Sequence, residues 1–162
     1  MNKSYLTLIS RIEKELSELD KILKKINRGW KMVEDTEDEL YIDSVALNLH
    51  DYYVCLERIF KLIASEIDES IPQGESWHEE LLKQMETEIK NTRPPILEAE
   101  TANQLDEYRG FRHVVRNVYT FNLSRERIEP LVQNLPGLNK ELRKDVESFL
   151  GFLEEQAESI NN

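Results

Sequence analysis

The sequence predicts an all-α protein, a bundle of four to five main helices that forms a single domain over residues 1–162. Three observations support this prediction. Apolar residues recur every three or four positions along most of the chain, which is the period of an amphipathic helix. Only five Gly and five Pro are present, fewer turn residues than an all-β fold normally needs. The length also suits one domain with a real core.

The first part of the chain predicts two long helices. Residues 5–30 form one, because their apolar positions follow the helical period. We expect Gly29 and the acidic run at 34–39, a solvated loop, to end it. Residues 40–67 form the second helix. Its apolar stripe consists of Val45, Leu49, Tyr52, Leu56, Ile59, Phe60 and Ile63.

A shorter helix is expected over residues 77–90. Ahead of it, the turn DESIPQGES contains Pro72 and Gly74, which stop regular structure. Ser76 fits the N-cap of this helix, and Glu79 follows three residues later, as in a capping box. Such a box would satisfy two backbone N–H groups at the helix start.

The C-terminal part predicts three further helices. They run from Thr101 or Asn103 to about Tyr119, near 125–133, and over 138–158. Pro94-Pro95 forces an extended segment before the first of them. Pro136-Gly137 is expected to break the chain before the last one.

The net charge of −11 restricts the partners. An acidic surface repels phosphates, so binding of long duplex DNA over the whole surface is not expected. A nucleic-acid contact would need a local basic island. The stretch from Tyr108 to Arg127 has five Arg and a single acid, Glu126, and thus a net charge of +4.

On a helical wheel, the first part of this basic stretch divides into two faces. The apolar arc consists of Tyr108, Phe111, Val114, Val115 and Val118. The opposite arc presents Arg109, Arg112, His113, Arg116 and Asn117, with Tyr119 at the border. Arginine donates two parallel hydrogen bonds to phosphate, and histidine exchanges a proton near neutral pH. The face therefore suits a phosphodiester. The alternative is a solvated face whose arginines pair with acids such as Asp106 and Glu107.

Other features favour a cytoplasmic protein without a metal or other cofactor. No apolar stretch approaches the roughly 20 residues that span a bilayer, and the N-terminus lacks the pattern of a signal peptide. Cys55 is the single cysteine, which excludes an internal disulfide and fits a buried small residue. No two histidines have the i, i+4 spacing of a metal-binding helix. We interpret His78 as a surface or packing residue and expect His50 to lie at a border between two helices.

Three segments carry a resemblance to a known family: YRGFRHVVRNVY and, before it, ALNLHDYYVCLERIFKLIASEID and IPQGESWHEELLKQM. With them, the chain resembles the HEPN superfamily and its HepT-like toxins over about residues 40–153. The resemblance implies an all-α, metal-independent ribonuclease that acts on RNA. It also implies a homodimer whose two motifs line one cleft. Many such toxins are paired with a nucleotidyltransferase antitoxin of the MNT type, which modifies the motif tyrosine.

The family motif is Arg, four to six residues, then His, often with Tyr two positions later. Arg112 matches the arginine and Tyr119 the tyrosine, but Asn117 stands at the position of the histidine. The nearest histidine on this face is His113. The resemblance thus implies a site whose catalytic group is Arg112, His113, Asn117 and Tyr119, with Arg109 and Arg116 binding RNA phosphates.

Three interpretations remain open at this point. In the first, the protein is an active ribonuclease in which His113 takes over the role of the motif histidine. In the second, it is a degenerate, non-catalytic HEPN interaction module that binds a partner protein, RNA or a nucleotide, because Asn117 cannot shuttle a proton at neutral pH. In the third, it is a plain helical adaptor without an anion site.

Overall fold

The structure is a computed structural model that describes residues 2–117 and 123–160, without the side chains of residues 2, 116 and 117. The described part contains five helices and no strand: α1 (Asn2–Thr36), α2 (Glu39–Glu66), α3 (Trp77–Glu86), α4 (Ala99–Asn117) and α5 (Arg125–Ser159). The predicted all-α class and the predicted number of main helices are therefore confirmed. No helix in these two ranges is long and apolar enough to cross a membrane.

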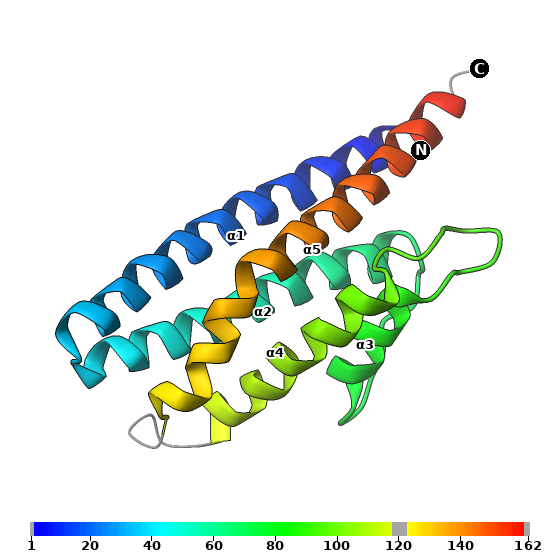
Figure 1. The fold of residues 1–162 in the computed structure, drawn as a ribbon. Helices are drawn as coiled ribbons and strands as arrows, with labels where there is room; N and C mark the ends of the chain where they lie inside the picture. The colour runs from blue at the N-terminus through cyan, green and yellow to red at the C-terminus, as the bar shows by residue number, and fades with distance from the viewer. Residues whose placement is uncertain (1, 118–122, 161–162) are drawn as a thin grey trace.

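The helix α2 is the centre of the bundle, because it contacts each of the other four helices. Figure 1 shows α1 and α2 as a long hairpin, with α5 beside α1, and with α3 and α4 on the other side of α2. The two ends of the chain lie at the same end of the bundle. The middle of α2 carries a broad buried face that includes Tyr52, Tyr53, Leu56 and the charged Glu57.

The first helix is longer than predicted, and the expected end at Gly29 is wrong. It continues to Thr36 because Trp30 and Val33 are buried in the core beyond the glycine. Gly29 instead permits a close approach between α1 and α2, since a Cβ atom here would lie 3.0 Å from Cγ2 of Val45. The acidic run is also not a loop, because most of it lies within the ends of α1 and α2.

The predicted helix over 77–90 ends earlier, at Glu86, and its predicted capping box does not form. Ser76 is the N-cap residue, but its side chain makes no capping hydrogen bond. Glu79 pairs with Lys83, one turn along the helix, with Oε1 3.2 Å from Nζ. The helix α4 begins at Ala99, earlier than the predicted start at Thr101 or Asn103.

The predicted break at Pro136-Gly137 is wrong, because α5 runs through both Pro130 and Pro136. An interior proline costs a helix about 3 kcal/mol. Buried residues on both sides of Pro136, such as Leu135 and Leu138, offset this cost, since each buried leucine contributes roughly 1.5–3 kcal/mol. The helix continues because its apolar face stays in the core.

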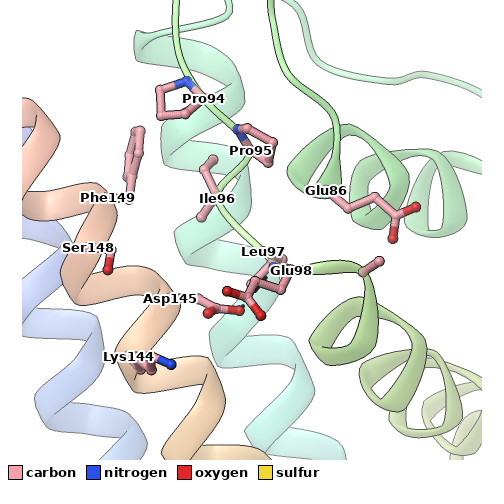
Figure 2. Close-up of a pocket in the computed structure, with 11 residues that line it drawn as sticks. Glu86, Pro94, Pro95, Ile96, Leu97, Glu98, Lys144, Asp145, Ser148 and Phe149 are labelled. Carbon is pink, nitrogen blue, oxygen red and sulfur yellow. Dashed lines mark hydrogen bonds between the residues drawn. The ribbon is translucent and has the colours of Figure 1, made fainter.

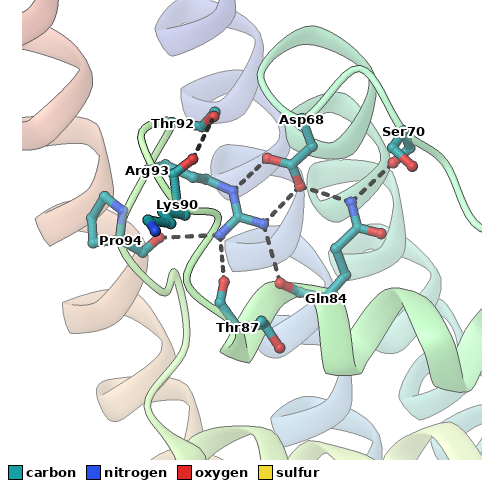
Figure 3. Close-up of polar contacts among 8 residues, drawn as sticks. All are labelled: Asp68, Ser70, Gln84, Thr87, Lys90, Thr92, Arg93 and Pro94. Carbon is teal, nitrogen blue, oxygen red and sulfur yellow. Dashed lines mark hydrogen bonds and ion pairs between the residues drawn. The ribbon is translucent and has the colours of Figure 1, made fainter.

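A buried ion pair fixes α3 and the following loop to the end of α2 (Figure 3). The Arg93 guanidinium donates to both carboxylate oxygens of Asp68, from Nε at 2.6 Å and from Nη2 at 2.7 Å. It also donates to the backbone carbonyls of Thr87, Pro94 and Gln84. The Gln84 amide donates to Asp68 as well. Because these groups satisfy one another inside the protein, they hold α3 in one position against α2.

Candidate functional site

A cleft of about 550 Å³ lies between the beginning of α3 and the middle of α4. Its lining residues are Glu75, Ser76, His78, Glu79, Arg109, Arg112 and His113. Three of these, Arg109, Arg112 and His113, are residues that the sequence places on the polar face of α4. The cleft is therefore the candidate site.

Behind the residues that line the cleft, a buried carboxylate pairs with an imidazole. Glu57 comes from the middle of α2 and is only 3% exposed. Its Oε2 lies 2.5 Å from Nδ1 of His78, at the start of α3. A carboxylate only accepts hydrogen bonds, so Nδ1 of His78 must carry the proton that is donated. In the neutral ring Nε2 is then the acceptor.

Arg112 of α4 packs against the same two side chains. Its Nε is 3.4 Å from Oε1 of Glu57, and its Nη1 is 3.0 Å from Nε2 of His78. The Nε group makes no hydrogen bond to any described residue, so its attraction to Glu57 is Coulombic. We call Glu57, His78 and Arg112 the Glu57 triad. It joins three helices at one wall of the cleft.

Carboxylates partly neutralise the arginines of the basic stretch from Tyr108 to Arg127. Arg109 donates from Nε to Oδ1 of Asp106 at 2.6 Å, and this hydrogen bond raises the pKa of the Arg109 guanidinium. Arg125 pairs with Glu129 at 3.7 Å. The pairing with Asp106 is the one that the alternative of a solvated face predicted. The net charge of +4 between Tyr108 and Arg127 therefore overstates the positive electrostatic field at the cleft.

The two faces of α4 divide as the helical wheel predicts, for the side chains that are described. Tyr108 and Phe111 are buried, and Val114 and Val115 pack against the core. His113 is exposed and lines the cleft.

The remaining predicted site residues stay predictions. The backbone of Arg116 and Asn117 lies in the last turn of α4, but their side chains are outside the described part. Tyr119 and Val118 lie in 118–122, outside the described residues.

The sequence did not reveal Glu57 as a residue of this site, and His78, interpreted as a surface or packing residue, packs against Glu57 and Arg112. The signal for Glu57 is present in the sequence. It is a charged residue one helical turn from both Tyr53 and Phe60, at the edge of the apolar stripe, and a buried carboxylate needs a partner. Nothing in the sequence indicates that the partners are His78 and Arg112.

His50 and Cys55 lie in α2 and do not line the cleft. Nδ1 of His50 is 3.3 Å from the half-exposed Asp51 carboxylate. Cys55 is buried and donates from Sγ to the carbonyl of Glu15, and burial raises the pKa of its thiol to about 11. These features fit a packing role for both side chains. Within the described residues, no three His, Cys, Asp or Glu side chains gather as metal ligands would.

A second hollow, of about 490 Å³, lies between the loop before α4 and α5 (Figure 2). It is lined in part by Pro94, Pro95, Ile96 and Phe149. Near it, the Asp145 carboxylate accepts a hydrogen bond from the backbone N–H of Glu98 at 3.0 Å, which fixes the start of α4. None of the predicted site residues lines this hollow.

Comparison with known protein families shows what the chain is similar to. The model of a family described as HepT-like protein matches residues 44–153, from the first turns of α2 to the later part of α5. This range includes the whole cleft and the Glu57 triad. No curated protein and no solved structure is significantly similar to the chain.

Proposed function

The chain belongs to the HepT-like protein family, and from this premise we propose that it is a toxin-type ribonuclease acting on RNA in the cleft beside Arg112. The observation that carries the proposal is the position of this motif arginine. Its side chain is 14% exposed, lines the cleft, and is held from behind by Glu57 and His78. An arginine that is fixed in advance loses little entropy when it binds a phosphate.

Arg112 would hold the scissile phosphate and stabilise the negative charge that develops on it. Donors aimed at such a charge in a partly buried site are worth about 2.7–4 kcal/mol each. Arg109 and Arg116 would contact neighbouring phosphates, which positions RNA without reading its sequence. Arg109 lines the cleft beside Arg112, which supports this role.

Proton transfer needs a group that titrates near neutral pH, and His113 is the candidate on α4 because it lines the cleft. Asn117 would orient a phosphate oxygen by a hydrogen bond, since an amide does not shuttle protons. Tyr119 would stack on a base or orient Arg112.

The family also suggests an assembly. We propose a cytoplasmic homodimer in which two clefts face one RNA, and an antitoxin of the MNT nucleotidyltransferase type that modifies Tyr119. A strictly monomeric mass in solution would contradict the composite cleft. A neighbouring gene for a nucleotidyltransferase would support the antitoxin.

The direct test is cleavage of an end-labelled, mixed-sequence RNA oligonucleotide by the purified protein in the presence of a chelator. We expect Arg112→Ala to lower the rate by about 100-fold or more. Arg11→Ala is the matched control, because Arg11 is an exposed arginine of α1 with a loose ion pair to Glu66 at 3.8 Å. Its rate should equal that of the wild type. Equal rates for wild type and Arg112→Ala would refute the proposal.

A non-catalytic HEPN interaction module is the second candidate. It is favoured by Asn117 at the histidine position and by the carboxylates that neutralise Arg109 and Arg112. In this case the wild type would bind RNA or a partner through Arg112 but not cut RNA. Asn117→His would then create cleavage activity. Activity in the wild type would exclude this candidate.

A further inference from the structure

We propose that His78, positioned by Glu57, is the general base of this ribonuclease, in place of the histidine that the α4 motif lacks at position 117. The proposal rests on the proposed function, because it names the proton acceptor of that same reaction. It differs from the family motif, because it places the base on α3 and not on α4, the helix of the motif arginine.

The first support is the surroundings of the ring. His78 joins the cleft to a buried carboxylate. Its side chain is 21% exposed, whereas that of Glu57 is 4% exposed. The imidazole therefore reaches solvent on the cleft side and is anchored from inside the bundle. The Trp77 ring, with its centroid 3.4 Å away, further restricts the imidazole.

The second support is the proton arrangement. Glu57 accepts the Nδ1 proton at 2.5 Å, which leaves Nε2 of the neutral ring with a lone pair. A carboxylate that holds Nδ1–H fixes the tautomer needed for a base and stabilises the imidazolium that forms when Nε2 takes a proton. Glu57 is thus a positioning residue, since it acts through His78.

The third support is the position of Arg112 relative to this ring. Its Nη1 lies 3.0 Å from Nε2 and 3.4 Å from Nδ1. These nearly equal distances place Nη1 alongside the ring, because an in-line hydrogen bond to Nε2 would leave Nη1 much farther from Nδ1. Nη1 therefore donates to Nε2 from beside the ring, and we propose that this hydrogen bond passes to the RNA phosphate on binding, which frees the Nε2 lone pair. A phosphate held by this guanidinium would lie within reach of Nε2.

The step that follows is an internal transesterification of RNA. Nε2 of His78 takes the proton of a ribose 2′-hydroxyl, and the 2′ oxygen forms a bond to the adjacent phosphorus. The bond from phosphorus to the 5′ oxygen breaks, and this oxygen takes a proton from the His113 imidazolium. The products are a 2′,3′-cyclic phosphate and a 5′-hydroxyl end. Exchange with water returns both imidazoles to their starting states.

The test uses the full chain, a labelled mixed-sequence RNA oligonucleotide and a chelator. We expect His78→Ala to lower the cleavage rate by about 100-fold or more, since general bases contribute 10²–10⁴-fold. RNA affinity should change by less than about threefold, because Arg112 supplies the phosphate contact. Added imidazole should enter the space left in the cleft and restore part of the rate, which a purely structural histidine would not allow.

His50→Ala is the matched control, because His50 also lies next to a carboxylate, Asp51, but is not in the cleft. It should keep the wild-type rate. Circular dichroism melting of each variant checks the fold, and His78→Gln provides a second, less disruptive loss of the base.

The outcomes separate the two proposals. If Arg112→Ala is inactive but His78→Ala and His78→Gln cut at nearly the wild-type rate, His78 is not the base and the ribonuclease proposal stands. If imidazole restores no cleavage to a folded His78→Ala protein, the catalytic role of His78 is also refuted. If the wild type binds RNA without cutting it, both the ribonuclease and the role of His78 are wrong, and the interaction module replaces them.

Discussion

Oε2 of Glu57 and Nδ1 of His78 are 2.5 Å apart, although the two residues are 21 positions apart in the sequence and belong to different helices. Glu57 also lies 3.4 Å from Arg112 on a third helix. One buried carboxylate thus orients both the proposed base and the proposed phosphate-binding group. Changes at Glu57 should affect the stability of the bundle and the chemistry of the cleft together.

The first prediction concerns Glu57→Gln. The glutamine carbonyl can still accept the Nδ1 proton of His78, but the negative charge opposite Arg112 is lost. We expect the rate at saturating RNA to fall by about 10-fold or more, with little change in KM, because the imidazolium loses its stabilising charge. Urea unfolding should show a loss of about 1–3 kcal/mol.

Glu80→Gln is the control for this variant, since Glu80 is an exposed residue of α3 outside the cleft lining. It should match the wild type in both measurements. An equal rate for Glu57→Gln and wild type would show that the charge of Glu57 has no part in the reaction.

The second prediction concerns the buried ion pair of Asp68 and Arg93, whose side chains are 2% and 0% exposed. Asp68→Asn leaves the Arg93 guanidinium buried without its counter-charge. Removal of one partner from such a pair costs about 3–5 kcal/mol, which urea unfolding would measure. Asp20→Asn is the control, because the pair of Asp20 with Arg143 is partly exposed, at 49% and 28%, and is worth about 1 kcal/mol or less. Equal losses in the two variants would contradict the assigned role of the buried pair.

The third prediction concerns alkaline pH. Burial raises the pKa of the phenols of Tyr52, Tyr53 and Tyr108 above the ordinary value of about 10. Below about pH 10 these groups are protonated in both the folded and the unfolded chain, so their contribution to stability is complete. Above it the unfolded chain releases protons that the folded chain keeps. The free energy of unfolding should therefore fall as pH rises.

Cys55 lowers the free energy of unfolding already from about pH 9, before the tyrosines do, because burial raises the pKa of its thiol from 9.0 to about 11. Urea unfolding at pH 7, 9, 10 and 11 would measure both effects. In Cys55→Ala the decline between about pH 9 and 10 should be smaller than in the wild type. A constant free energy of unfolding up to pH 11 would contradict the burial of these groups.

The fourth prediction compares two tyrosine hydroxyls. The hydroxyl of Tyr53 is buried and has no hydrogen-bond partner among the described residues, whereas that of Tyr108 donates to the carbonyl of Leu131 at 2.7 Å. Tyr53→Phe should be neutral or stabilise the protein by up to about 1 kcal/mol, because it removes an unsatisfied polar group. Tyr108→Phe should destabilise it by about 1–2 kcal/mol. Thermal melting would measure both variants. A lower melting temperature for Tyr53→Phe than for Tyr108→Phe would contradict the prediction.

Local periodicity predicted most of the helices, because the apolar stripe of a helix is written within a few turns of sequence. The prediction was wrong where burial outweighs local preference. Pro136 is an unfavourable residue for a helix interior, yet α5 continues through it because Leu135 and Leu138 are both in the core. In the same way, α1 continues past Gly29, because Trp30 is buried in the core and the glycine allows a close approach to Val45.

The sequence by itself determined the all-α class, the apolar stripe of the helix at 40–67 and the division of α4 into a buried face and a face with Arg109, Arg112 and His113. These properties depend on spacing within one helix. The tertiary structure alone decided that Glu57, His78 and Arg112 meet, because their contact depends on how α3 and α4 pack on α2. That packing is set by side chains far apart in the chain, including Asp68 and Arg93, and no local pattern encodes it.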